Sequence, residues 1–431
     1  GTKVGYSSFS SEPTTFKTLP AVRNRSATRI KIGLIGSQVS IEMDSETITV
    51  AGKPKFMKFV QSSAGRKQTI EAYFSTDTIN VDVDNNGSKT KQKLKLPKDG
   101  LVVDDPVAEL ALKPGSASKT QKFYVFDPST VSLVANTLSG KPKPSGGHVI
   151  EISDPRMSTT VETDAKGEIS KVSTTIGLEM APATEAEALA EISGDSQPDL
   201  ADLTSIKPTP SIKEPMKTSL LKLKLSAANL PPIPIDTQTT GSKQGSTWTL
   251  NIKPTQLRDA KTVSIAAARS AKKVWAQPSL LMPSSKPQFI SLAKEIVGKR
   301  TDVKSASLAI RSYVNRNMSP NAGIGILRDA SEIIKGKEGV CRDYAILTAT
   351  LCRAAGIPTR LASGLANFDG NFYYHAWVEV WTGYDWVGMD SVPSDDFFSA
   401  THVKLSQGNV DQAFTFTVLA QGKIEVVDQR S

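Results

Sequence analysis

Cys341 is the residue in this chain whose type and position favour nucleophilic chemistry. It follows a glycine-bearing turn at 337–340 and precedes an apolar run to about residue 355 that predicts a helix. A thiol at a helix N-terminus faces free backbone N–H groups and the positive end of the helix dipole, and both favour the reactive thiolate. Taken alone, Cys341 is better interpreted as a small core residue, since free cysteines are often buried.

The second cysteine, Cys352, lies in the apolar body of the same predicted helix and is interpreted as a core residue. At ~1.5 Å per residue the two thiols stand ~16 Å apart along the helix axis. This separation is too large for a disulfide bond. It also excludes a metal site made by these two thiols, and we expect neither a metal nor a cofactor.

A predicted β-hairpin over 373–390 carries His375 on its first strand and Asp390 at the end of its second. A two-residue loop at 383–384 would place Asp390 opposite Trp377 and diagonal to His375. Diagonal partners lie ~7–8 Å apart at Cα and point to the same face of the sheet. An odd loop length or a bulge would break this arrangement.

A thiol, an imidazole and a carboxylate form a catalytic group when they meet. The imidazole takes the thiol proton, and the carboxylate orients the imidazole and stabilises its charge. We therefore predict Cys341, His375 and Asp390 as catalytic residues. His402 is assigned a structural or supporting role, and His148, in a β-rich region, is assigned no function.

The chain has 431 residues, which is too long for one ordinary core and predicts two or three domains. No stretch approaches the ~20 apolar residues of a membrane helix, and no signal peptide is visible. The chain opens at Gly1 and reads as a mature sequence. Together with a β-rich first half, this leads us to expect an extracytoplasmic protein, periplasmic or secreted.

Three regions differ in their patterns. Period-2 alternation and Gly/Asn/Asp turns predict a mostly antiparallel β domain over 1–205 with an acidic linker at its end, and one helix after the Asp-Pro-Ser at 127–129. A small β unit and connector is expected over 206–280, with strands at Leu220–Leu225 and Trp248–Ile252 and a Pro-, Gly-, Ser- and Thr-rich stretch between them. Helical spacing followed by strands predicts an α+β catalytic domain over 281–431, with a C-terminal strand.

The net charge of +9 is uneven, because nearly all of the basic excess lies before residue 284. The basic region could bind an anionic partner at a cell surface. A solubilising surface is the favoured interpretation, since the lysines are scattered along strands. No nucleic-acid-binding motif is present, so a nucleic-acid partner is not expected.

Four separated segments together resemble the transglutaminase-like superfamily of papain-like thiol enzymes, in the form of a bacterial multidomain member. The segments are Gly339–Ala345, Cys352–Arg360, His375–Val380 and Trp386–Asp390, and the segment 399–405 resembles it more weakly. The resemblance implies a helix that carries Cys341 and packs on an antiparallel sheet.

The resemblance also implies acyl transfer. Cys341 would attack a carboxamide or peptide carbonyl of a protein or peptide substrate and form a thioester. Water would then complete a cysteine protease or amidase reaction, whereas an amine would complete protein-glutamine crosslinking. The Cys341 N–H would be one oxyanion donor, and Asn317 is a candidate for the second. The alternative is a catalytically inactive transglutaminase-like binding or scaffold protein.

Overall fold

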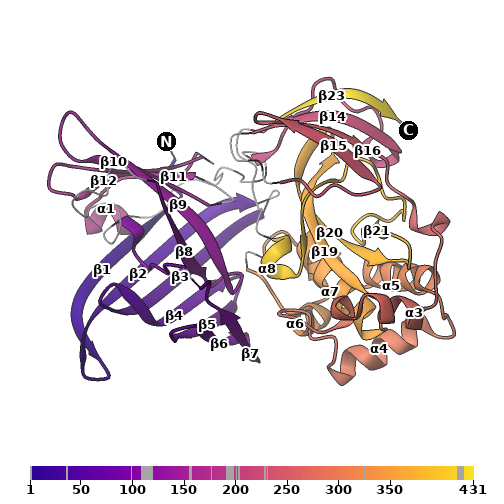
Figure 1. Cartoon of the computed structure of the whole chain (residues 1–431), viewed down its shortest axis with the longest axis horizontal. Coiled ribbons are helices and arrows are strands. Elements are labelled where there is room, and N and C mark those ends of the chain that lie inside the picture. Colours follow the sequence, from indigo (N-terminus) through magenta and orange to yellow (C-terminus); the bar gives the residue numbers. More distant parts are fainter. Residues whose placement is uncertain are drawn as a thin grey trace. The chain divides into compact units, whose positions relative to one another are not determined.

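The structure is a computed structural model. It describes residues 2–34, 37–98, 100–107, 120–154, 158–175, 177–190, 199, 201, 204–227, 230, 232–324, 326–414 and 422–431. The chain divides into two compact units (Figure 1), an N-terminal unit of residues 1–203 with 323–326 and a C-terminal unit of residues 204–322 with 327–431. Within the described ranges, no helix has the length and apolar character needed to cross a bilayer.

The N-terminal unit contains a seven-stranded antiparallel sheet whose strands follow one another in chain order. Alternation along each strand separates a buried face from a solvent face, as in β5, where Ile70 and Ala72 are fully buried and Glu71 is not. The strands are β1 (Gly5–Phe16), β2 (Leu19–Leu34), β3 (Ser37–Val50), β4 (Lys53–Ser63), β5 (Arg66–Phe74), β6 (Thr78–Asn85) and β7 (Ser88–Lys95).

A second antiparallel sheet in this unit has six strands in the order β13-β12-β11-β10-β9-β8. Its buried face carries Phe123, Leu138 and Ile150, and Phe126 meets Phe74 of β5 edge to face with ring centroids 5.9 Å apart. The expected β-rich first region, with several antiparallel sheets, is thus confirmed. The elements are β8 (Gln121–Asp127), β9 (Ser132–Pro142), β10 (His148–Ser153), β11 (Ser158–Thr163), β12 (Ile169–Thr174), β13 (Glu179–Met180) and helix α1 (Glu185–Leu189).

The prediction of a helix after residues 127–129 is wrong. Asp127 Oδ1 accepts hydrogen bonds from the Ser129 N–H at 2.9 Å and from its hydroxyl at 2.6 Å. This local side-chain bonding forms a turn, which competes with helix formation. The chain then passes through Val131, with φ of 51°, straight into β9. Much of the acidic linker falls within 191–198, which lies outside the described residues.

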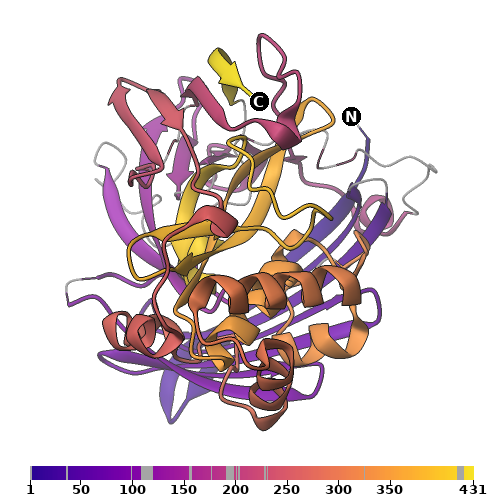
Figure 2. The same cartoon turned by 90° about the vertical axis from the view of Figure 1, so that its right-hand side faces the viewer.

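The C-terminal unit gathers its helices on one side of a four-stranded sheet (Figures 1 and 2). Helix α7 is buried along most of its length and packs against α4, α5 and the sheet strands. The helical elements are η2 (Pro215–Lys217), η3 (Leu257–Asp259), α3 (Ile265–Ala271), η4 (Lys273–Ala276), α4 (Pro287–Val297), α5 (Val303–Asn317), α6 (Ala330–Gly336), α7 (Cys341–Ala354) and α8 (Val410–Ala413).

The four-stranded sheet has the order β21-β20-β19-β22, and all of its pairs are antiparallel. In the last hairpin Trp381 faces Trp386 and Val378 faces Met389. The two-residue loop and the register predicted for this hairpin are therefore confirmed. The strands are β19 (Thr359–Phe368), β20 (Asn371–Trp381), β21 (Trp386–Met389) and β22 (Val403–Gly408).

A smaller sheet of order β15-β16-β14-β23 completes the C-terminal unit. The two strands expected near 220 and 248 are present, and β15 is an additional one. The C-terminal strand pairs with β14, so its first core residue, Ile424, faces Leu225. The domain boundaries at 205 and 280 stay a prediction. The strands are β14 (Leu220–Ser226), β15 (Thr239–Gln244), β16 (Thr247–Ile252) and β23 (Lys423–Arg430); the short pair β17 (Ser319–Pro320) and β18 (Glu338–Gly339) leads into α7.

Candidate active site

Cys341 is the first residue of α7, and a buried polar network shapes the turn before it. The Asp343 carboxylate accepts the Val340 N–H at 2.9 Å and the Arg328 Nε–H at 3.2 Å. Arg328 and Asp343 are both fully buried. Gly339 must be glycine, because a Cβ there would lie 2.5 Å from the Asp343 Cβ. This turn starts the helix at Cys341 and leaves its thiol partly exposed.

His375 and Asp390 form a direct pair, with His375 Nε2 lying 2.8 Å from Asp390 Oδ2. Both side chains are buried. The Cys341 thiol lies within hydrogen-bonding reach of the His375 imidazole, and since Nε2 faces Asp390, Nδ1 is the nitrogen left for the thiol. Burial alone lowers the pKa of His375, but the Asp390 carboxylate and the Cys341 thiol outweigh it and raise that pKa to about 10.

The loop that carries Asp390 is bound by two helices. From α5, Arg311 donates its Nε–H to the Asp390 carbonyl at 2.8 Å, and Asn315 donates its amide to the Ser391 carbonyl at 3.0 Å. From α7, the Thr348 hydroxyl lies 2.8 Å from the Ser391 hydroxyl. Asp390 is thus positioned by contacts at its own carbonyl and at Ser391, the residue after it.

His402, the residue just before β22, joins the group. Its Nε2 lies 3.3 Å from Asp390 Oδ2, and its Nδ1 lies 3.0 Å from the Ser399 carbonyl oxygen. His375, Asp390 and His402 each offer one ligand atom within 4.8 Å of the others. The 2.8 Å separation between His375 and Asp390 is that of a charge-assisted hydrogen bond, so we describe the three as a hydrogen-bonded group.

Three other residues named from the sequence take no part in this group. Cys352 is fully buried, and burial raises the pKa of its thiol to about 12. The Asn317 side-chain amide donates at 2.8 Å to the Tyr313 carbonyl of its own helix. His148 begins β10 in the N-terminal unit.

The sequence pointed to Cys341, His375 and Asp390. In the structure His375 pairs with Asp390, and the Cys341 thiol contributes to the raised pKa of His375. The sequence did not point to Arg311 or Asn315, which bind the Asp390 loop. The available signal for Arg311 was its place beside Ile310 in the apolar stripe of a helix, where a buried arginine needs specific partners. Thr348 shares the helix face of Cys341 at helical spacing, which was a further signal.

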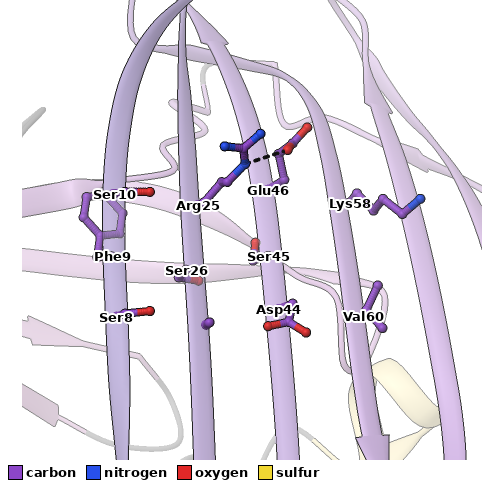
Figure 3. Close-up of a pocket in the computed structure, with 11 residues that line it drawn as sticks. Ser8, Phe9, Ser10, Arg25, Ser26, Asp44, Ser45, Glu46, Lys58 and Val60 are labelled. Atoms are coloured by element: carbon purple, nitrogen blue, oxygen red, sulfur yellow. Dashed lines mark hydrogen bonds and ion pairs between the residues drawn. The ribbon is translucent and has the colours of Figure 1, made fainter. Parts of the chain in front are cut away.

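A separate hollow of about 350 Å³ lies on the solvent face of β1 to β4 in the N-terminal unit. Figure 3 shows Ser10, Arg25, Glu46 and Lys58 side by side across these four strands. Arg25 pairs with Glu46 at 3.1 Å and Lys58 pairs with Glu71 of β5 at 3.0 Å. The charges of Arg25 and Lys58 are thus paired with carboxylates.

One part of the chain matches a known protein family. Residues 290–391 match the family model of the transglutaminase-like superfamily. Over 163 residues the chain is 25% identical to the uncharacterized proteins Mb2599c of Mycobacterium bovis and Rv2569c of Mycobacterium tuberculosis, covering 35% of this chain. The chain spans 43% of the length of these curated relatives.

Two solved structures are also similar to this chain. One is named "Putative Cysteine Protease" from Cytophaga hutchinsonii, with 19% identity, a TM-score of 0.35, and coverage of 50% of this chain and 89% of that one. The other is a beta-barrel-like protein of a domain of unknown function from Brucella abortus, with 15% identity, a TM-score of 0.28, and coverage of 36% and 75%. The family model alone identifies the segment that carries Cys341, His375 and Asp390: residues 290–391 form a transglutaminase-like domain.

Proposed function

We propose that this protein performs thiol-dependent acyl transfer on a carboxamide or peptide bond, through a thioester at Cys341. The observation that carries the proposal is the contact chain from the Cys341 thiol to His375 and on to Asp390, 2.8 Å away. A thiol at a helix N-terminus beside an imidazole is converted readily to the thiolate.

The reaction would proceed in two displacements. The Cys341 sulfur attacks the carbonyl carbon, a C–S bond forms, and His375 gives its proton to the departing amine or ammonia as the C–N bond breaks. Water then attacks the thioester while His375 takes its proton, which releases an acid and restores the thiol. An attacking amine in place of water would give a crosslinked amide.

The first N–H groups of α7 suit the developing oxyanion. An N–H in the first turn of a helix has no acceptor within the helix, and donors aimed at the developing charge are a large term in catalysis. The Cys341 N–H is the proposed donor. Asn317 is a weaker candidate for a second donor than the sequence suggested, since its amide already binds the Tyr313 carbonyl.

The test compares the two cysteines, which serve as matched controls for each other. Near neutral pH, iodoacetamide should label Cys341 rapidly in the full chain and in Cys352→Ala, while Cys341→Ala should show no rapid labelling. Mass spectrometry of digested protein locates the label. Rapid labelling of Cys352 would contradict the assignment of the nucleophile.

Turnover is measured separately. The active chain should release ammonia from glutamine peptides, cleave peptides, or incorporate an amine, and Cys341→Ala should do none of these. A reactive Cys341 with none of the three activities across a peptide panel would favour the alternative of a binding or scaffold protein that keeps the fold.

A further inference from the structure

His402 presents both of its ring nitrogens to hydrogen-bond acceptors. Nδ1 lies 3.0 Å from the Ser399 carbonyl oxygen and Nε2 lies 3.3 Å from Asp390 Oδ2. A carbonyl cannot donate, and an ionised carboxylate cannot donate either. Burial raises the pKa of Asp390, but His375 and His402 outweigh it and hold that pKa well below its usual range.

A neutral imidazole has a single N–H and would satisfy only one of these two oxygens. Its other nitrogen would then turn a lone pair toward an oxygen lone pair inside the protein, where unmet polar groups are costly. Both contacts of His402 are hydrogen bonds only when both nitrogens carry a proton.

We propose that His402 is an imidazolium in the resting protein and acts as a positioning residue that holds Asp390 toward His375 and balances its charge. The inference rests on the proposed thiol chemistry of Cys341 and His375. The partly exposed Cys341 thiolate of the proposed chemistry, with the buried His375 imidazolium and Asp390 carboxylate, would carry one net negative charge. The second imidazolium brings this group to neutrality, which low-dielectric surroundings favour.

The fold brings His402 to Asp390 through a close approach of two strands. Gly364 of β19 faces His375 of β20 and pairs on its other side with Lys404 of β22. A Cβ on Gly364 would lie 2.0 Å from the Val403 carbonyl oxygen, so only glycine allows this approach. His402 immediately precedes β22, so the close approach of β22 to β19 places it beside His375 and Asp390.

Aromatic rings fix the plane of the His402 imidazole. Its ring centroid lies 4.2 Å from that of Phe398 in a stacked arrangement and 5.1 Å from that of Trp377 at a steep angle. The titratable groups that face it are Asp390 and His375, whose ring centroid is 5.6 Å away. Arg311 approaches from α5 but donates its Nε–H to the Asp390 backbone carbonyl.

The protonation of His402 can be read directly, because the chain has only three histidines. In the full chain labelled with ¹⁵N-histidine, the NMR signals of His402 at pH 7 should show both ring nitrogens protonated. His148→Gln and His375→Gln assign the other two histidines by elimination. An unprotonated Nε2 of His402 would overturn the proposal. A His402 spectrum that changes when a chelator is added would also overturn it, because it would indicate a metal bound at this histidine.

The charge role is separated from packing by His402→Phe, which keeps an aromatic ring beside Phe398 but removes both N–H groups. Loss of the second cation should raise the pH at which His375 titrates by about one unit, a tenfold change in its protonation equilibrium. His402→Gln provides a second variant. An unchanged or lower His375 titration in a folded variant would assign His402 a packing role only.

These readouts do not depend on turnover. In one outcome, Cys341 proves unreactive while His402 is doubly protonated and substitution of His402 raises the pH at which His375 titrates. In that case the proposed function fails and this inference stands. If Cys341 reacts as proposed while His402 carries a single ring proton, this inference fails and the proposed function stands.

Discussion

Asp390 is the residue on which the candidate site converges. Its Oδ2 faces both His375 and His402, its Oδ1 accepts the Val392 N–H at 2.9 Å, and its carbonyl accepts the Arg311 Nε–H. A buried carboxylate with this many donors stays ionised and fixes the group that it contacts. The proton of His375 is therefore governed mainly by a residue that would not touch the substrate.

Removing the Asp390 charge should change stability in a defined pH window. The pKa of folded His375 is raised to about 10, above the ~6.5 of an unfolded histidine. Its protonated form thus stabilises the fold fully below about pH 6.5, and this contribution is lost as the pH rises toward 10. The stability advantage of the natural chain over Asp390→Asn should decline across that window.

The five tryptophans all lie in the C-terminal unit, so tryptophan fluorescence during urea unfolding reports the stability of that unit. The exposed Asp369, in the turn between β19 and β20, provides the control Asp369→Asn, which should track the natural chain at every pH. If the stability difference between the natural chain and Asp390→Asn stays constant from pH 6 to 10, protonation of His375 is not coupled to folding as predicted.

Among the secondary-structure elements, helix α7 contacts the candidate site at two places. Its N-terminus presents Cys341, and its buried body carries Thr348, which reaches the Asp390 loop through Ser391. The packing of α7 against the β20–β21 hairpin therefore sets the distance from the Cys341 thiol to the His375 imidazole.

Two buried threonines of α7 allow this seating to be tested. Thr348 bonds the Ser391 hydroxyl at 2.8 Å, whereas Thr350 bonds only the Ile346 carbonyl of its own helix at 2.7 Å. Thr348→Val and Thr350→Val should each cost about 1 kcal/mol of stability. Only Thr348→Val should slow alkylation of Cys341 at pH 7, and equal alkylation rates in the two variants would rule out the positioning role of this contact.

At the largest scale, the first and last segments of the C-terminal unit pair with each other. Residues 204–209 enter it beside β23, where the Thr209 N–H donates to the Ile424 carbonyl at 2.9 Å and the Thr209 carbonyl accepts the Val426 N–H at 2.8 Å. Ile206 pairs with Phe372 on β20, the strand of His375. The core of the small sheet therefore continues to the strand that carries the imidazole.

Weakening these contacts between its two ends should destabilise the whole C-terminal unit, including the distant candidate site. Ile424 is 3% exposed in the core of the small sheet, whereas Val427 on the same strand is 46% exposed. Ile424→Ala should cost about 2–5 kcal/mol, and Val427→Ala about 0.5 kcal/mol or less. Tryptophan fluorescence during urea unfolding measures both, and equal effects would show that β23 is not part of the cooperative core.

Sequence patterns predicted the local structure around the site well. The apolar run after Cys341 predicted α7, and the register of the hairpin placed Asp390 diagonal to His375, because loop length and a side-chain period of two determine both. The same reasoning failed after Asp127, where side-chain bonding to the backbone produced a turn. It also missed β15, since strand pairing there overrides a Gly-, Ser- and Thr-rich composition.

Local sequence was enough to predict the helix and hairpin that carry Cys341, His375 and Asp390, and to reveal the family resemblance, because these depend on neighbours along the chain. The contacts of His402 and Arg311 with Asp390 could be found only in the folded chain. Arg311 lies 79 residues from Asp390 and reaches it through the packing of α5. His402 lies 12 residues from Asp390, and the close approach of β22 to β19 at Gly364 brings it there. Side-chain periodicity describes which face a residue occupies, and only packing decides what meets that face.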